Sequence, residues 1–184
     1  AAPTRSPTTE KRTTATKIRK VIERLIKKPQ YQPITLQSFL QRLAAEFSDQ
    51  FPAATIEINC DKNITVSTVA SIKDAIRELV TNAIIHNDVR SPEVTVRVTT
   101  DSYGVYITVG DNGPTIPEME RRVLLGDEER TPTYHGSGLG LWLVNVIAAR
   151  SGGYVQWEDI EPHGNIISIT LPHSVLDGRV EAAG

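Results

Sequence analysis

The segment from Val69 to Ile84 constrains the fold more than any other part of the sequence. Its apolar residues recur three or four positions apart, the spacing of one face of an α-helix. An apolar face of this length needs a second layer of structure to cover it. Ser67 or Thr68 is the expected N-cap, because a hydroxyl there accepts a hydrogen bond from the first turn.

The second layer is expected to be a β-sheet, because five segments alternate apolar and polar residues. These segments are 55–59, 94–98, 105–109, 154–158 and 166–171. Asp101 to Gly104 has the composition of a turn and predicts a hairpin between the second and third segments. Further helices are predicted from Leu36 to just before Pro52, from Glu118 to Leu125, and from Leu139 to about Arg150. The fold class is therefore α/β: a two-layer α/β sandwich with a mixed, mostly antiparallel sheet covered on one face by about three helices.

Composition divides the 184 residues into a central domain and two loose ends. Residues 1–15 are rich in Thr, Ser and Pro and predict a disordered leader. Residues 16–30 predict a linker helix. Residues 31–175 form the expected folded domain, and residues 176–184 a flexible tail.

The overall charge and the single cysteine exclude several classes of protein. A formal net charge of -2 gives no electrostatic reason to expect a nucleic-acid partner. Cys60 has no second cysteine to pair with, which agrees with a reducing compartment. No run approaches the ~18 apolar residues of a spanning helix. We expect a cytoplasmic location without direct membrane contact by this segment, any membrane anchor lying elsewhere in a longer parent protein.

The first candidate motif lies on the long helix. Glu78, Asn82 and His86 stand four residues apart and share one helix face. A solvated surface explains such a polar stripe equally well. The functional interpretation is a hard-cation site, because an amide oxygen such as that of Asn82 suits Mg²⁺, which takes few protein ligands when phosphates supply others. Glu78 would position or deprotonate a water molecule, or hold a metal-bound one, and His86 would meet a phosphate oxygen.

The second motif, Asp111-Asn112-Gly113-Pro114, directly follows a predicted strand. Its composition is also that of an ordinary turn. A carboxylate only accepts hydrogen bonds, so Asp111 at a strand end would suit an exocyclic amino group such as that of adenine. Gly113 would let the backbone come close to the base.

The third motif, Gly136-Ser137-Gly138-Leu139-Gly140-Leu141, leads directly into a predicted helix. Alternating glycines let backbone N–H groups converge on an anion, and the helix N-terminus adds its dipole. A dinucleotide-binding fingerprint requires a preceding strand, whereas residues 128–135 are polar, and a P-loop requires Gly-Lys-Ser/Thr, which is absent. A lid or linker loop without a ligand is the remaining alternative.

In this order and at these distances, the three motifs resemble the N, G1 and G2 boxes of the Bergerat-fold (GHKL) ATPase superfamily. Glu78 to His86 is similar to the N box, Asp111 to Gly113 to the G1 box, and Gly136 to Leu141 to the G2 box. The segment from Gly138 to Val144 most resembles the catalytic domain of two-component sensor histidine kinases.

The resemblance implies ATP and Mg²⁺ as ligands, with residues 31–175 as the ATP-binding catalytic domain and residues 16–30 as the possible end of a dimerisation hairpin. Glu78 and Asn82 would be catalytic, and Asn82 would hold the metal. A mobile lid over about residues 119–137 would close on the phosphates. The residues expected at the nucleotide are Asn82, His86, Asn87, Asp111, Gly113, Ile116, His135, Gly136, Ser137, Gly138, Leu139, Gly140 and Leu141.

The implied reaction is Mg²⁺-dependent transfer of the ATP γ-phosphoryl group to a histidine, and then to a response regulator receiver. None of His86, His135, His163 and His173 lies on an amphipathic helix before an acidic residue. The acceptor is therefore expected in a missing or separate histidine phosphoacceptor domain. Dimerisation is expected only through a missing helical hairpin. The alternative is an anti-sigma or switch-type ATP-binding serine kinase or regulatory binding module.

Overall fold

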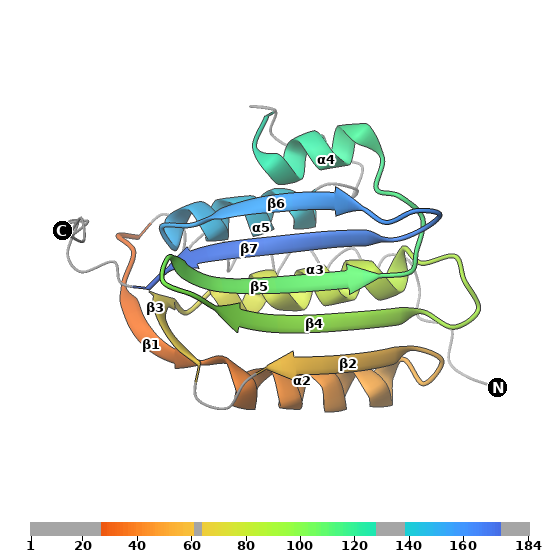
Figure 1. Cartoon of the computed structure of the whole chain (residues 1–184), viewed down its shortest axis with the longest axis horizontal. Coiled ribbons are helices and arrows are strands. Elements are labelled where there is room, and N and C mark those ends of the chain that lie inside the picture. The colour runs from red at the N-terminus through yellow and green to blue at the C-terminus, as the bar shows by residue number, and fades with distance from the viewer. Residues whose placement is uncertain (1–26, 61–63, 128–138, 174–184) are drawn as a thin grey trace.

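The computed structural model describes residues 27–60, 64–127 and 139–173. Within them, a five-stranded sheet has the order β2-β4-β5-β7-β6 (Figure 1). Its strands are β2 (Thr55–Cys60), β4 (Glu93–Thr100), β5 (Gly104–Asp111), β6 (Tyr154–Asp159) and β7 (Asn165–Pro172). β2 and β4 are parallel, and the other neighbouring strands are antiparallel. The sheet is therefore mixed and mostly antiparallel, as predicted.

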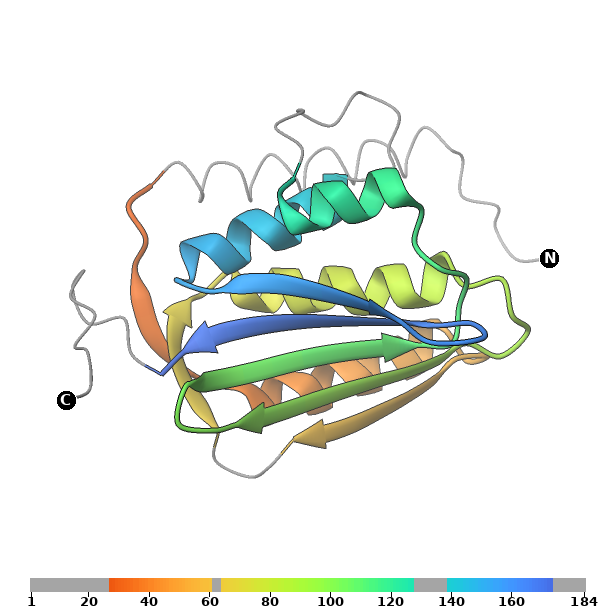
Figure 2. The same cartoon turned by 45° about the horizontal axis from the view of Figure 1, so that its top comes forward.

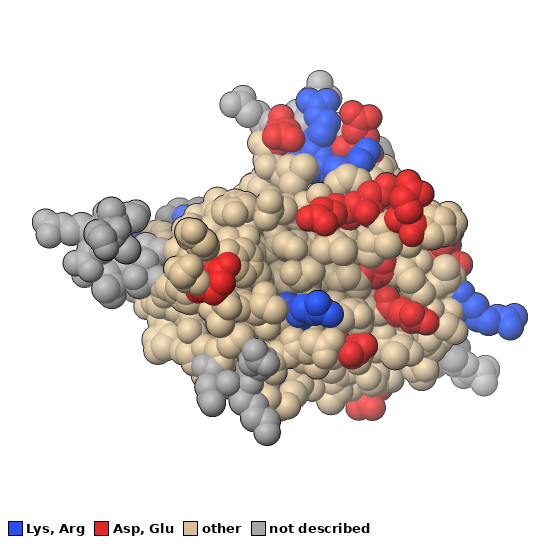
Figure 3. Space-filling model, in the orientation of Figure 1, with Lys and Arg blue, Asp and Glu red and all other residues tan. Residues whose placement is uncertain are grey.

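Helices of the described part of the chain lie over one face of this sheet (Figure 2). α2 (Leu36–Gln50) contacts β2, α3 (Ile72–Ile85) contacts β4 and β5, and α5 (Leu139–Arg150) contacts β6 and β7. The other face carries mostly uncharged side chains, with acidic ones gathered over part of it (Figure 3). α4 (Glu118–Leu125) has the bounds that the sequence predicts and packs on α5 and β6. The predicted two-layer α/β sandwich is confirmed.

A second, two-stranded sheet joins β1 (Tyr31–Thr35) to β3 (Thr65–Val69). It shows that the expected start of the long helix is wrong: Ser67, Thr68 and Val69 lie in β3, and α3 begins at Ile72. Ser71 precedes α3, and its side chain makes no capping hydrogen bond. The β-branched residues of β3 favour a strand, and pairing with β1 outweighs the helical spacing of Val69.

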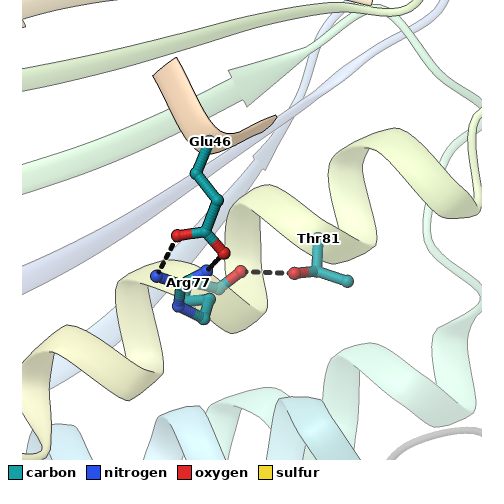
Figure 4. A network of polar contacts seen from close by, with 3 residues as sticks. All are labelled: Glu46, Arg77 and Thr81. Atoms are coloured by element: carbon teal, nitrogen blue, oxygen red, sulfur yellow. Dashed lines mark hydrogen bonds and ion pairs between the residues drawn. The ribbon is translucent and has the colours of Figure 1, made fainter. Parts of the chain in front are cut away.

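A bidentate ion pair ties α2 to α3 (Figure 4). The two terminal nitrogens of Arg77 donate to the two carboxylate oxygens of Glu46 at 2.7 and 2.8 Å. The guanidinium also lies 5.6 Å from the ring centroid of Phe47. Because the pair is partly exposed, its contribution to stability is small, about 1 kcal/mol or less. Its geometry nevertheless fixes α3 beside α2 at the residue directly before Glu78.

The chain enters this domain beside the end of α5. Residues 27–30 have no helical structure, and the Tyr31 hydroxyl donates to the Arg150 carbonyl oxygen at 2.9 Å. The predicted leader, residues 16–26 of the predicted linker helix, and the predicted tail lie outside the described residues. No helix of the described ranges is long and apolar enough to cross a bilayer.

The packing predicts that Ile107→Ala lowers the free energy of unfolding by about 2–5 kcal/mol, because it leaves a cavity in the core. Ile107 is 0% exposed and lies on the central strand β5. Urea unfolding would measure the loss. Tyr103→Ala is the control, since Tyr103 is 83% exposed and should change stability by about 0.5 kcal/mol or less. Equal effects of the two substitutions would contradict this packing.

Candidate functional site

A cavity of about 320 Å³ lies between α3, the end of β5, the segment after β5, and the start of α5. It brings together residues of all three sequence motifs, although these are far apart in the chain. The predicted site residues that line it are Glu78, Asn82, His86, Asn87, Asp111, Gly113, Ile116, Gly140 and Leu141. Leu139 is the first residue of α5 and does not line the cavity. His135, Gly136, Ser137 and Gly138, with most of the predicted lid, lie outside the described residues.

The polar stripe of α3 faces the cavity. Glu78, Asn82 and His86 all line it, while the opposite side of the helix is buried in the core. His86 follows the last helical residue, and its backbone N–H donates to the Asn82 carbonyl oxygen at 3.1 Å. The amphipathic pattern therefore orients these side chains: burying the apolar face leaves the polar face toward the gap between α3 and α5.

Glu78 lies directly against Gly140, so the first and third motifs are in contact. A Cβ atom on Gly140 would stand 1.9 Å from Oε1 of Glu78 and 2.7 Å from its Cδ. Any side chain at this position would displace the carboxylate. The third glycine of the third motif is thus needed for space next to Glu78, a requirement that the sequence analysis did not anticipate.

Asp111 ends β5 with its carboxylate in the cavity wall. Its Oδ1 accepts hydrogen bonds from the Gly113 N–H at 2.8 Å and from Nδ2 of Asn165 at 3.1 Å. Burial raises the pKa of Asp111 above its ordinary value of 3.8, and these two hydrogen bonds offset part of the rise. A half-buried acceptor at a cavity wall is the kind of group that reads a ligand's N–H donor.

Asn165 is the main site residue that sequence reasoning missed. It begins β7, is 3% exposed, and pairs in register with Asp111 across the β5–β7 ladder. Its amide also donates to the Pro114 carbonyl oxygen at 2.9 Å. A lone Asn before an apolar run carries no spacing signal. Only the antiparallel register, which sets the start of one strand against the end of another, reveals it.

Asn112 links the turn after β5 to the loop after α3. Its Oδ1 accepts from Nδ2 of Asn87 and from the Glu93 N–H, both at 2.9 Å. Asn87 in turn accepts the Val89 N–H at 3.1 Å. A Cβ on Gly113 would lie 3.1 Å from the Asn87 side chain, so the turn packs tightly there. Asn87 therefore holds the cavity wall in shape, and a direct contact to a nucleotide stays a prediction.

The cavity also contains residues outside the predicted set. Val109 and Ile167 add an apolar floor from β5 and β7, and Glu120 adds a carboxylate from α4. The Thr115 hydroxyl donates to Oδ1 of Asp159 at 2.9 Å and so ties the cavity rim to β6. This combination of an apolar floor and a few convergent polar groups is typical of small-molecule sites.

Residues 67–175 match the family model of histidine kinase-, DNA gyrase B- and HSP90-like ATPases. The match spans all three motifs and more than half of the 184 residues. The chain belongs to this ATPase family. The resemblance to this family that the three motifs suggested is therefore confirmed.

The relatives of this chain within the ATPase family include sensor kinases. The chain is 31% identical over 129 residues to the sensor-type histidine kinase PrrB of Mycobacterium leprae, covering 68% of this chain and 28% of PrrB. It thus spans less than a third of that relative's length. The crystal structure of the ATP-binding domain of PrrB from Mycobacterium tuberculosis has 25% identity and a TM-score of 0.64, covering 78% of this chain and 98% of that domain.

A further solved structure agrees in fold. Histidine kinase ThkA, crystallised in complex with the response regulator protein TrrA, superposes with a TM-score of 0.68 at 20% identity. The alignment covers 90% of this chain and 49% of the ThkA chain. At this identity the likeness concerns the fold, and it confirms the α/β architecture expected for this ATPase family.

The Glu78–Gly140 contact predicts non-additive substitutions. Gly140→Ala should lower the free energy of unfolding by about 1 kcal/mol, because its methyl group displaces the Glu78 carboxylate, the end of a flexible side chain at the cavity. The same substitution in a Glu78→Ala background should have a much smaller effect, since the obstacle is gone. Urea unfolding of both single variants and the double variant would measure the coupling. Gly110→Ala is the control, because a Cβ there meets only the Asn165 carbonyl oxygen, at 3.8 Å. Strictly additive effects would exclude the contact.

The raised pKa of Asp111 predicts a pH-dependent stability difference. Between its ordinary pKa and the raised one, the folded chain binds more protons than the unfolded chain, so stability falls as pH rises. Asp111→Asn abolishes this titration. The stability of the variant relative to wild type should therefore increase from about pH 3 to about pH 7 in urea unfolding. Asp49→Asn makes the same charge change at an exposed position of α2 and serves as control. The same pH dependence in both variants would contradict the assignment.

Proposed function

We propose that this chain is the ATP-binding catalytic part of a sensor histidine kinase. It would transfer the γ-phosphoryl group of ATP to a histidine in a dimerisation domain. The observation that carries the proposal is the single cavity shared by Asn82, Asp111 and Gly140, one residue from each motif. The sensor kinases among its relatives support the choice of this reaction within the ATPase family.

The adenine ring would lie at the end of the cavity near Asp111. Apolar side chains from α3, β5 and β7, namely Leu79, Val109 and Ile167, offer a surface for a flat ring. Oδ1 of Asp111 already accepts two hydrogen bonds, while the contact of Oδ2 among the described residues is a long one of 3.4 Å to Asn165. Oδ2 therefore has acceptor capacity for the adenine amino group. A guanine ring would present a carbonyl oxygen there instead, so the carboxylate would select against it.

The phosphates would lie toward the N-terminus of α5. This helix has 12 residues and starts at Leu139, within the glycine-rich motif. Free backbone N–H groups and the helix dipole favour negative charge at such an end. Gly138, Gly136, Ser137 and His135 would contribute from the segment before α5, and Gly140 leaves room for close approach.

Mg²⁺ would be held by Asn82 together with phosphate oxygens and water. The donor set fits this arrangement, because the amide oxygen is a hard ligand and Mg²⁺ needs only one or two protein groups beside phosphates. Within the described ranges, no group of three or more His, Cys, Asp and Glu side chains is placed to hold a metal ion. When bound, the ion neutralises charge on the phosphates as the γ-phosphoryl group leaves. His86, beside Asn82 in the cavity wall, would meet a phosphate oxygen.

In the proposed reaction, a nitrogen of the acceptor histidine forms a bond to the γ-phosphorus while the bond to the bridging oxygen breaks and ADP leaves. The protein contributes mainly positioning and electrostatic stabilisation. Glu78, half-buried beside the start of α5, would orient the attacking group through its acceptor oxygens. The same carboxylate could orient water, which would allow slow hydrolysis. The phosphoryl group would then pass to a response regulator receiver, and we place the reaction in the cytoplasm.

Nucleotide titration tests the site. Asp111→Asn should lower ATP affinity at least about tenfold and reduce the preference for ATP over GTP, because an amide can present a donor to the base. Asn82→Ala should remove the gain in ATP affinity that MgCl₂ produces. Calorimetry would measure both. Asp49→Asn and Asn59→Ala are exposed matched controls and should bind as wild type does. Unchanged ATP affinity in both site variants would refute the assignment.

Label transfer from γ-labelled ATP tests the acceptor with the same variants. A separately supplied dimerisation domain with its histidine should acquire an acid-labile label, and Asp111→Asn should abolish it. An acid-stable phosphoserine on a partner protein would instead favour the switch-type serine kinase.

A further inference from the structure

The carboxamide of Asn165 connects four separate segments of the chain. Its Nδ2 contacts both oxygens of Asp111 and the Pro114 carbonyl oxygen, at 3.1, 3.4 and 2.9 Å. Its Oδ1 accepts from the Ile116 N–H at 3.0 Å and from Nε1 of Trp157 at 3.2 Å. A 3% exposed amide with this many partners leaves no polar capacity unused.

These partners also fix which way the amide points. Oδ1 faces two N–H groups, which only donate, and Nδ2 faces three oxygens that lack a proton. Reversing the amide would therefore break every one of these contacts. An ionised Asp at this position would lack the donor, and Leu would lack both the donor and the acceptor. The position therefore requires a side chain that holds a donor and an acceptor at a fixed separation.

Trp157 extends the connection from β7 to α4. Its indole N–H is held by Asn165, and the guanidinium of Arg121 lies 4.4 Å from its ring centroid. In the described part of the chain, the buried Nε of Arg121 has no hydrogen-bond partner, so the ring face is its principal contact there. Arg121 belongs to α4, which among the described elements is the one directly before α5 in the chain.

We infer that Asn165 is a positioning residue that orients the Asp111 carboxylate for adenine and, through Trp157 and Arg121, couples it to α4. The inference rests on the proposed function, because it assigns Asp111 to the base. By holding Oδ1 of Asp111 together with the Gly113 N–H, Asn165 leaves Oδ2 for the ligand. A movement of the carboxylate on binding would be transmitted to the indole and its guanidinium.

Nucleotide affinity and base selectivity form the first test. Asn165→Leu should weaken ATP binding at least about tenfold and reduce the ATP-to-GTP preference, because Asp111 loses its orienting donor. Trp157→Phe keeps the ring under Arg121 but removes the N–H, and should weaken ATP binding about threefold. Trp142→Phe is the matched control, since this second tryptophan does not line the cavity, and should bind as wild type does. Thermal unfolding with and without ATP would verify that each variant is folded.

The pH profile of Asn165→Asp separates orientation from simple packing. This variant keeps the volume but faces Asp111 with a second carboxyl group about 3 Å away, so the two groups would share one proton. With that proton the new group still donates to Asp111; without it, two like charges face each other. ATP affinity should therefore fall more steeply with rising pH than in wild type, as the pair loses its shared proton. Other titratable groups near this position are Asp159, its cross-strand partner on β6, and Arg121 on α4, together with Glu78, His86 and Glu120 in the cavity. All of them are common to both proteins.

Fluorescence tests the coupling to α4. In a Trp142→Phe background, emission comes from Trp157 alone and should change on saturation with ATP. Arg121→Gln should reduce that change, whereas Arg122→Gln, on the exposed side of α4, should not.

The outcomes separate this inference from the proposed function. If Asp111→Asn abolishes ATP binding while every Asn165 and Trp157 variant keeps wild-type affinity, selectivity and pH profile, the positioning role is refuted and the function stands. An unchanged Trp157 emission at saturating ATP refutes the coupling. If Asp111→Asn itself binds ATP as wild type does, the proposed function fails.

Discussion

The burial of the apolar face of α3 is the constraint on which the site depends. Once that face packs against β4, β5 and α5, the stripe of Glu78, Asn82 and His86 must point into the remaining gap. The Arg77–Glu46 pair adds a contact between this helix and α2 at the same place. Because a rigid helix sets these spacings, side chains on it keep their relative positions with little reorganisation, which favours binding of a ligand that needs several groups at once.

The opposite wall of the cavity places a carboxylate where its charge is not fully solvated. Burial at the end of β5 raises the pKa of Asp111, and the donors from Gly113 and Asn165 compensate only in part. Such a residue is less favourable for folding than a neutral one would be, yet the proposed recognition of a base needs an acceptor oxygen with remaining hydrogen-bonding capacity. The Asn165 amide resolves part of this conflict, because it satisfies one side of the carboxylate and leaves the other side to a ligand.

The wrong prediction for the start of the long helix has its physical origin in strand pairing. The helical spacing of Val69 is real, but β3 gains a partner strand from β1, thirty-odd residues earlier in the chain, and this pairing moves the start of α3 to Ile72. By contrast, the bounds of α4 and α5 agree with the sequence, because Pro117 before the one and Gly152 after the other set these ends locally.

The sequence by itself was enough to recognise the ATPase family, to predict the five strands of the main sheet and the helices that cover it, and to name the residues of the three motifs, because periodicity and motif spacing are local properties of a chain. It did not predict β1 or β3. It did not reveal the roles of Asn165, Trp157 or the Glu78–Gly140 contact. Each of these is a hydrogen bond or a close contact between segments that are distant in sequence. Strand register and helix packing determine these contacts, and both are properties of the tertiary structure.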